Sequence, residues 1–268
     1  MADWASLLDR LKASSPLVLC LTNTVTVNDC ANALLAVGAS PVMSEDPQDA
    51  ESLARLASAL VINIGTLNEA SLAVMRRAAA AAAEAGVPIV LDPVGAGATP
   101  RRLAAALEFL PAAKIVRGNA SEILALCAPS DEGSAGQKGV DSTAAATEET
   151  LARKIAALAE SRGLVAAVTG PTDLVADGAT VLKVAGGTPL LTKLTGAGCL
   201  LSALIGAYVG ANPDRPLLAA AGALRHLARA AEKAEAGLGT PGALGGFKAA
   251  LFDWLGLIAG GDLLGPGD

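Results

Sequence analysis

Aromatic residues are almost absent from this sequence: Phe, Tyr and Trp together make up 2% of its 268 residues. Hydrophobic residues still make up 52% of the chain, so a core has to be built mainly from Ala, Val, Leu and Ile. The 29 glycines indicate many tight turns. This composition is typical of an alternating α/β protein. The length predicts one large domain over residues 1–268.

The chain also lacks basic clusters and long uninterrupted apolar runs. Its net charge is −6 and Lys and Arg never gather beyond pairs, so the electrostatic footprint of a nucleic-acid-binding protein is missing. The apolar stretch 72–91 is interrupted by Arg76, Arg77 and Glu84, which argues against a membrane span. The acidic, amphipathic N-terminus does not resemble a signal peptide. We therefore expect a cytoplasmic protein with small-molecule partners, not nucleic acid or membrane.

Histidine occurs once, as His226, and the four cysteines show no Cys-x-x-Cys spacing. This pattern argues against a zinc site and a disulfide framework. His226 lies in an Ala/Leu helical pattern, which predicts a place on a helix surface. A cysteine-nucleophile hydrolase would then lack its histidine partner. Cys20 and Cys127 are predicted to be small buried hydrophobic residues.

Short apolar, β-branched runs alternate with helix-length segments rich in Ala and Leu. The runs predict buried parallel strands at 16–23, 59–65, 87–93, 114–119 and 164–170. Helices are predicted near 28–37, 47–58, 68–85, 100–109, 120–127, 147–162, 197–211, 216–236 and 245–259. The alternation predicts βα units wound around one sheet. Around Asp177-Gly178 the hydrophobic period changes to two, which predicts an antiparallel hairpin at the sheet edge.

Two segments carry no such pattern. The polar stretch 129–150 predicts a mobile loop within the domain, because the alternation resumes after it. The glycine-rich tail 260–268 is predicted to be loosely held.

The segment 195–199, Thr-Gly-Ala-Gly-Cys, leads directly into a predicted helix. Its two glycines allow several backbone N–H groups to converge at the helix N-terminus, an anion site suited to a transferring phosphoryl group. A glycine turn before a helix is also a common packing turn. It is not a Walker A loop, because the Gly-Lys-Ser/Thr ending is absent.

Polar residues that follow the predicted strands are further candidates, because ligands of open α/β sheets bind beyond the carboxyl ends of the strands. Asn119 and Glu122 have the spacing of a helix capping box. Arg117 beside them suggests an additional role, with the guanidinium on a phosphate and Glu122 on a magnesium ion through water. Asp92 is either a turn residue or a second carboxylate on the magnesium side.

Eight segments, taken together and in order, resemble the hydroxyethylthiazole kinase family, the thiamine-salvage members of the ribokinase-like group. They are LTNTVTVND (21–29), GASPVMSED (38–46), LVINIGTL (60–67), VLDPVGAG (90–97), VRGNASEI (116–123), KGVDS (138–142), AVTGPTDLVADG (167–178) and LTKLTGAGCLLSALIGA (191–207). The resemblance implies a three-layer α/β/α fold with a mostly parallel sheet and an antiparallel edge hairpin. It also implies a single kinase domain over residues 1–268 without a separate lid domain. It also implies ATP-dependent phosphorylation of the hydroxyl group of 4-methyl-5-(2-hydroxyethyl)thiazole, with Mg²⁺.

The resemblance further implies residue roles. The thiazole would be bound by Asn23, Met43 and Gly196, ATP by Arg117 and Thr169, and the metal by Glu122 and Asp92. Family members are usually trimeric with the thiazole site shared between subunits, so a homotrimer is expected.

Cys199 stands where related kinases place an aspartate. Phosphoryl transfer depends mainly on positioning and charge neutralisation, so a weak base is sufficient. The helix dipole is expected to lower the pKa of the Cys199 thiol, which could then take the substrate proton. Alternatively, Cys199 is a small residue that leaves room for the hydroxyethyl arm. The other functions left open are a ribokinase-like kinase of a hydroxymethylpyrimidine or sugar alcohol, and a non-catalytic nucleotide-binding protein.

Overall fold

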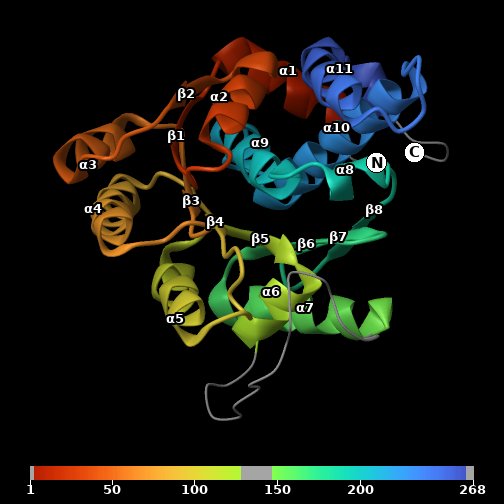
Figure 1. Cartoon of the computed structure of the whole chain (residues 1–268). Coiled ribbons are helices and arrows are strands. Elements are labelled where there is room, and N and C mark those ends of the chain that lie inside the picture. Colours follow the sequence, from red (N-terminus) through yellow and green to blue (C-terminus); the bar gives the residue numbers. More distant parts are fainter. Residues whose placement is uncertain (1–2, 128–146, 264–268) are drawn as a thin grey trace.

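The computed structural model describes residues 3–127 and 147–263, in which eight strands form one sheet between two layers of helices (Figure 1). The strands are β1 (Leu17–Leu21), β2 (Ser40–Val42), β3 (Ala59–Asn63), β4 (Ile89–Asp92), β5 (Ile115–Asn119), β6 (Val165–Thr169), β7 (Asp173–Ala176) and β8 (Val181–Val184). Their order is β2-β1-β3-β4-β5-β6-β7-β8. The strands from β2 to β6 pair in parallel, and β7 and β8 are antiparallel.

Helices cover both faces of this sheet (Figure 1). One layer holds α3 (Pro47–Leu56), α4 (Glu69–Ala85), α5 (Pro100–Phe109), α6 (Ala120–Cys127) and α7 (Glu148–Arg162). The other holds α1 (Trp4–Ser14), α2 (Val27–Ala36), α9 (Ala197–Ala211), α10 (Pro216–Ala236) and α11 (Leu244–Leu257). The shorter helices are the 3-10 helices η1 (Leu110–Ala112) and η2 (Gly260–Leu263) and the α-helix α8 (Leu190–Lys193). Among the described residues, no helix combines the length and apolar character that crossing a membrane requires.

Local signals explain where several helices begin. Asp46 caps α3 by accepting hydrogen bonds from the backbone N–H groups of Gln48 and Asp49, both at 2.9 Å. Thr99 caps α5 through the N–H of Arg102. Each cap is followed by a proline at the first helical position, where no hydrogen bond is lost.

The two faces of the sheet bury different side chains because neighbouring strand residues point in opposite directions. In β3, Val61 packs with the α9 layer and Leu60 with the α4 layer. Gly206 lets α9 approach the sheet closely, since a Cβ there would lie 2.6 Å from the Val61 side chain. Both cores are built mainly of aliphatic residues, as the scarcity of aromatics predicts.

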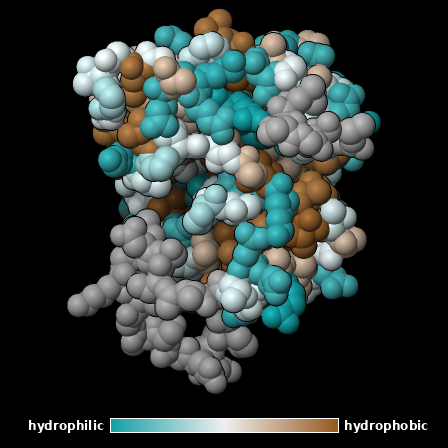
Figure 2. Space-filling model, turned by 90° about the vertical axis from the view of Figure 1, so that its right-hand side faces the viewer, coloured by the Kyte–Doolittle hydropathy of each residue, from teal (hydrophilic) through white to brown (hydrophobic). Residues whose placement is uncertain are grey.

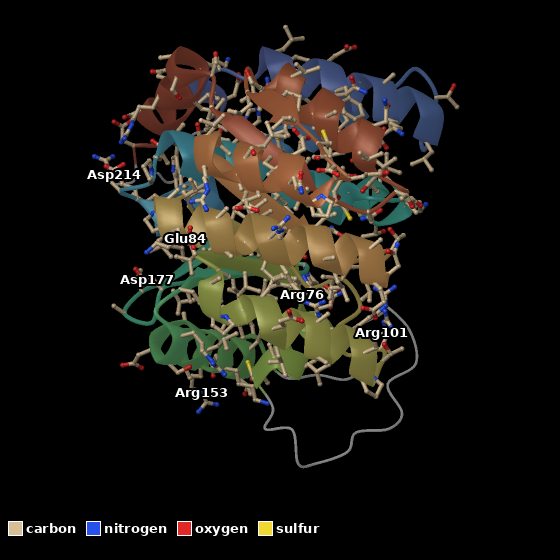
Figure 3. All side chains as sticks on the ribbon, turned by 90° about the vertical axis from the view of Figure 1, so that its left-hand side faces the viewer. Arg76, Glu84, Arg101, Arg153, Asp177 and Asp214 are labelled. Atoms are coloured by element: carbon tan, nitrogen blue, oxygen red, sulfur yellow. The ribbon has the colours of Figure 1, made fainter. Side chains whose placement is uncertain are left out.

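The outer surface of the α3–α5 layer carries exposed ion pairs between neighbouring helices. They join Arg55 to Glu84, Arg76 to Glu108 and Arg101 to Glu69, and Figure 3 shows Arg76, Glu84 and Arg101 on this surface. Exposed pairs add little to stability, so the apolar faces beneath them hold the layer.

The predicted strands and the edge hairpin are confirmed, with most strand ends one or two residues shorter than predicted. The strand β2 was not predicted, since its three residues, one exposed and two half-buried, show no clear alternation. The predicted loose tail is wrong over Gly260–Leu263, which forms η2 with Leu263 buried. Residues 264–268 lie outside the described residues. So does most of the predicted 129–150 loop, whose last residues form the start of α7.

The predicted surface position of His226 is also wrong, because α11 covers the face of α10 that carries it. The side chain is fully buried. Its Nε2 lies 2.9 Å from the carbonyl oxygen of Leu255 and its Nδ1 lies 2.9 Å from the hydroxyl of Tyr208. A carbonyl only accepts, so Nε2 carries the proton and the Tyr208 hydroxyl donates to Nδ1.

Burial lowers the pKa of His226 from its ordinary value of 6.5 to about 4. Below pH 6.5 the unfolded chain therefore binds a proton that the folded protein does not bind until about pH 4. The free energy of unfolding decreases as the pH is lowered from 6.5 to about 4. Between pH 7 and pH 5 this group should cost about 2 kcal/mol. Burial raises the pKa of Asp92 to about 6, which acts in the opposite sense.

A comparison with His226→Gln isolates the histidine, because Asp92 is common to both proteins. Urea unfolding at pH 7 and pH 5 should show wild type losing about 2 kcal/mol relative to the variant. An equal change in both proteins would contradict a buried neutral His226.

Candidate active site

The carboxyl ends of the parallel strands bring most of the predicted site residues to one edge of the sheet. Asn23 follows β1, Asp92 ends β4, Arg117 lies in β5 and Thr169 ends β6. The chain runs from β1 outward to β2 and then back to β3 on the other side of β1. Such a reversal opens a crevice beyond β1 and β3, the usual ligand site of open α/β sheets.

A chain of hydrogen bonds crosses this crevice. The Nδ2 group of Asn23 donates to Cys199 Sγ and to Asn63 Oδ1, both at 3.1 Å. The Nδ2 group of Asn63 donates to Asp92 Oδ2 at 2.7 Å, and Ser202 Oγ donates to the same oxygen at 2.8 Å. The structure thus links Asn23, Cys199 and Asp92 through Asn63, which the sequence did not single out.

Asp92 is fully buried, and burial raises the pKa of its carboxyl group to about 6. The Arg117 guanidinium, whose Nη1 is 3.9 Å from Asp92 Oδ2, acts against this effect. Oδ2 takes the hydrogen bonds described above, whereas Oδ1 is buried without a hydrogen-bond partner. A carboxylate oxygen left in this way fits a cation such as Mg²⁺.

Glu122 forms the capping box that its spacing predicts. Its N–H donates to Asn119 Oδ1, and its Oε2 accepts from the Asn119 N–H. The other oxygen, Oε1, accepts from the N–H of Gly95 in the loop after β4. The described residues contain no cluster of three or more His, Cys, Asp or Glu suited to a metal. Mg²⁺ beside a nucleotide commonly uses only one or two carboxylates, with phosphates and water as its other ligands.

The two glycines at the start of α9 allow the side chains of Thr26 and Arg117 to pack closely against the backbone of this turn. Gly196, the N-cap, has a φ of +83°, and a Cβ there would lie 2.3 Å from the Thr26 side chain. A Cβ on Gly198 would lie 2.5 Å from Arg117 Nη1.

No side chain caps α9, and the N–H of its first residue, Ala197, donates to the carbonyl oxygen of Leu194. The N–H groups of Gly198 and Cys199 remain at the helix N-terminus beside the Arg117 guanidinium. This geometry fits the predicted anion site.

Cys199 lies in the first turn of α9 and is half-buried. Burial raises the pKa of its thiol, and the nearby Asp92 carboxylate raises it further. The predicted lowering of this pKa is therefore wrong, because desolvation and a neighbouring negative charge outweigh the helix dipole. Both effects favour the protonated thiol of Cys199 over the thiolate.

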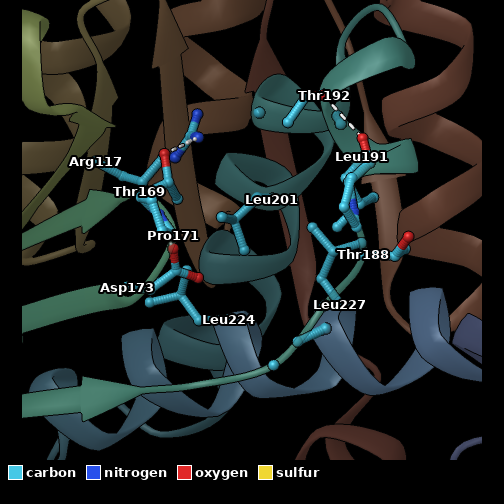
Figure 4. A pocket seen from close by; sticks show the side chains of 17 residues that line it. Arg117, Thr169, Pro171, Asp173, Thr188, Leu191, Thr192, Leu201, Leu224 and Leu227 are labelled. Atoms are coloured by element: carbon cyan, nitrogen blue, oxygen red, sulfur yellow. Dashed lines mark hydrogen bonds between the residues drawn. The ribbon is translucent and has the colours of Figure 1, made fainter. Parts of the chain in front are cut away.

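A cavity of about 680 Å³ opens beside Arg117 and the start of α9 (Figure 4). At one end Arg117 Nη2 donates to Thr169 Oγ1 at 2.8 Å, and the opposite walls are apolar. The walls include Leu191, Leu201, Leu224 and Leu227. In the space-filling view, hydrophobic side chains gather around the hollowed middle of this side of the molecule (Figure 2). A polar end for phosphates and an apolar body for a base are the features that a nucleotide requires.

The sequence did not identify Asp173, which also lines this cavity. Its Oδ1 accepts from the Gly170 N–H at 2.9 Å, and burial raises its pKa to about 6. The only signal was its place after the Thr-Gly turn of residues 169–170.

A smaller cavity of about 220 Å³ lies at the crevice, lined in part by Thr22, Ser44 and Thr66. These residues follow β1, β2 and β3. Met43, half-buried, directly precedes Ser44 and packs against the core shared with α9. Met43 therefore lies at the same edge of the sheet as Asn23.

Comparisons with known proteins agree with this architecture. Residues 8–259 match the model of the hydroxyethylthiazole kinase family. A hydroxyethylthiazole kinase of Granulibacter bethesdensis is 47% identical over 239 residues, covering 89% of this chain and 85% of that protein. The structure of a hydroxyethylthiazole kinase protein from Pyrococcus horikoshii OT3 superposes with a TM-score of 0.85 at 40% identity, covering 97% and 94% of the two chains.

A more distant structure supports the fold alone. A ribokinase-like superfamily protein from Enterococcus faecalis aligns with a TM-score of 0.61 at 13% identity, covering 94% of this chain and 95% of that one. The predicted ribokinase-like three-layer fold is confirmed. With the family model matching most of its length and close relatives covering nearly all of it, the chain belongs to the hydroxyethylthiazole kinase family.

Proposed function

We propose that the protein transfers the γ-phosphoryl group of ATP to the hydroxyl group of 4-methyl-5-(2-hydroxyethyl)thiazole, yielding the thiazole phosphate and ADP in thiamine salvage. One observation carries the proposal: hydrogen bonds connect Asn23 and Cys199 at the switch-point crevice to Asp92, beside Arg117 of the larger cavity. An acceptor substrate and a nucleotide can thus meet at the start of α9. Family membership supplies the identity of the acceptor.

In this proposal each side of the site has a distinct task. Asn23, Met43 and Gly196 hold the thiazole so that its hydroxyl group faces the phosphoryl group. Arg117 and the N-terminal N–H groups of α9 neutralise charge on the transferring phosphoryl, which supplies most of the acceleration in such reactions. Thr169 holds the Arg117 guanidinium in place through their hydrogen bond. The protein works as one kinase domain without a separate lid.

We propose that Mg²⁺ is held by Asp92, through its unpartnered Oδ1, and by Glu122 through water. When bound, the ion neutralises phosphate charge. The chain's own part is to keep the two carboxylates oriented, through Asn63 and Ser202 for Asp92 and through the backbone of Gly95 and Asn119 for Glu122.

Glu122→Gln tests the metal assignment. The variant keeps the size of the side chain but removes its charge, so the Mg²⁺ concentration for half-maximal rate should rise about tenfold. Circular dichroism should show an intact fold. Glu69→Gln, which alters an exposed first-turn glutamate of α4, is the control and should leave this concentration unchanged. An unaltered magnesium dependence in Glu122→Gln would remove Glu122 from the metal site.

Cys199 is proposed to take the substrate proton in its thiolate form, after the thiol has released its own proton to solvent. Because the pKa of the thiol is raised, this form is a minority in the ligand-free protein. Cys199→Ala and Cys199→Ser should both lower kcat about tenfold or more, since neither side chain is a comparable base, while the KM for ATP stays near that of wild type. Steady-state kinetics at saturating thiazole measure both constants. An unchanged kcat in Cys199→Ala would show that the residue only leaves space.

We also propose a homotrimer in which a neighbouring subunit completes the thiazole site. Val25 and Val27, next to Asn23, are 63% and 38% exposed in the isolated chain, so apolar surface adjoins the site where a subunit would bind. The cytoplasmic location expected from the sequence stays a prediction.

A panel of acceptors tests the function against its alternatives. ADP formation should depend on the thiazole alcohol and not on hydroxymethylpyrimidine or sugar alcohols. A preference for one of those would favour the related kinases, and nucleotide binding without ADP formation would favour a non-catalytic protein. A cysteine-nucleophile hydrolase is not favoured, because His226 is bonded to Tyr208 and Leu255 and cannot serve Cys199.

A further inference from the structure

We propose that Asn63 is a positioning residue that holds the Asn23 amide so that an N–H group faces Cys199 and the reacting hydroxyl. The inference rests on the proposed function and deepens it. It explains how the amide of Asn23, on the thiazole side of the site, is oriented by a residue that is bonded to Asp92 on the nucleotide side. Asn63 ends β3 at the switch point and is almost fully buried, with 1% of its surface exposed.

The orientation of the Asn63 amide follows from its neighbours. Asp92 Oδ2, a carboxylate oxygen, accepts at 2.7 Å, so the NH₂ group must point toward it. The backbone N–H of Gly65 can only donate, so the carbonyl oxygen Oδ1 must point toward Gly65, at 2.9 Å. Both restraints select the same orientation, and neither could be met if the amide were turned over.

This orientation is passed on to Asn23. Asn63 Oδ1 faces Asn23, so Asn23 must present its NH₂ group, and the second hydrogen of that group points to Cys199 Sγ. Asn23 Oδ1 accepts from the N–H of Val25 and the hydroxyl of Thr26. Both nitrogen-bound hydrogens and both lone-pair directions of the Asn23 amide are thereby used.

The two sets of restraints on Asn23 differ in rigidity. Val25 and Thr26 belong to the loop between β1 and α2, and Val25 is exposed. Asn63 lies on β3, an interior strand of the sheet whose residues are all buried. Asn63 is therefore the fixed support against which the loop residue is held. An N–H facing the reacting atoms stabilises negative charge there, whether on sulfur or on oxygen, whereas a carbonyl would oppose it.

Thiazole binding without ATP or metal tests this support. Asn63→Ala should weaken thiazole affinity, measured by calorimetry, about tenfold, the factor expected for losing a well-oriented hydrogen bond in a buried site. Asn212→Ala is the matched control. It removes another buried asparagine amide, which donates to the carbonyl oxygens of Leu7 and Tyr208 and has no contact with Asn23, so thiazole affinity should change less than twofold.

A double-mutant cycle separates positioning from a general structural role. If Asn63 acts through Asn23, Asn63→Ala should have no further effect on thiazole affinity in the Asn23→Ala background. Additive losses would overturn the inference. If Asn63→Ala does not fold, Asn63→Ser replaces it in the cycle, since it keeps one hydrogen-bonding group in the buried site and removes the amide.

A substrate-free readout decides the inference independently of the proposed function. Alkylation of Cys199 by iodoacetamide, followed by mass spectrometry of its peptide, should slow about fivefold at pH 8 in Asn63→Ala, because the thiolate loses its N–H donor. The Asn212→Ala rate should match wild type. Unchanged alkylation in Asn63→Ala would overturn the inference. Absence of thiazole phosphorylation by wild type would instead overturn the proposed function. The alkylation rates would still test whether Asn63 positions the Asn23 amide.

Discussion

Arg117→Ala is expected to lower kcat/KM for ATP by about a thousandfold, the scale on which a charged group aimed at a transferring phosphoryl acts. Arg117 is largely buried, lines the larger cavity, and lies against Gly198 at the start of α9. Its Nε is buried without a hydrogen-bond partner. Steady-state kinetics with varied ATP provide the measurement.

Arg117→Lys is the control for charge. Lysine keeps the cation near Asp92, so the fold should be retained, but an ammonium group cannot bond Thr169 and a phosphate in the planar geometry of guanidinium. We expect kcat/KM for ATP to fall about a hundredfold in Arg117→Lys, a smaller loss than in Arg117→Ala. Wild-type kinetics in Arg117→Ala would remove Arg117 from the nucleotide site.

Gly198→Ala is expected to lower kcat/KM for ATP about a hundredfold while the protein stays folded. The added Cβ would lie 2.5 Å from Arg117 Nη1 and 3.0 Å from Nη2. These atoms are the far end of a flexible side chain, so the guanidinium moves and the helix stays in place. The hydrogen bond to Thr169 and the phosphate contact are then lost together.

Gly246→Ala serves as the matched control for a glycine in the first turn of a helix. In α11 an added Cβ there would meet only the Leu238 side chain at 3.6 Å, an ordinary contact. Its kinetics should equal those of wild type, with stability equal or slightly higher. If Gly198→Ala retains wild-type kinetics, the close approach of Arg117 to α9 has no catalytic role.

The sequence predicts the fold well because the signals are repeated and local. Apolar runs ended by turn residues mark five parallel strands, and the Asp46-Pro47 and Thr99-Pro100 pairs mark two helix starts. The features that the sequence does not predict are either short elements or properties that depend on tertiary packing. The three residues of β2 show no alternation, and His226 is buried because α9 and α11 pack against α10.

Part of the arrangement of the candidate site could also be predicted. Strand-end positions make Asn23, Asp92, Arg117 and Thr169 candidates, and the sheet topology brings them to one edge. Asn63 is not predicted as a site residue because it is a single polar residue within an apolar run. The pKa of Cys199 depends on burial and on Asp92, which is 107 positions away in sequence but close in the fold, so no local pattern could give its direction.

The most direct test of the account is to identify the phosphorylated product. Purified protein is incubated with ATP, Mg²⁺ and 4-methyl-5-(2-hydroxyethyl)thiazole, and ³¹P nuclear magnetic resonance follows the phosphate ester and ADP. The account predicts equal amounts of thiazole phosphate and ADP with wild type, and neither product above background with Arg117→Ala in the same time. ADP formation without the ester, or no thiazole-dependent reaction at all, would contradict it.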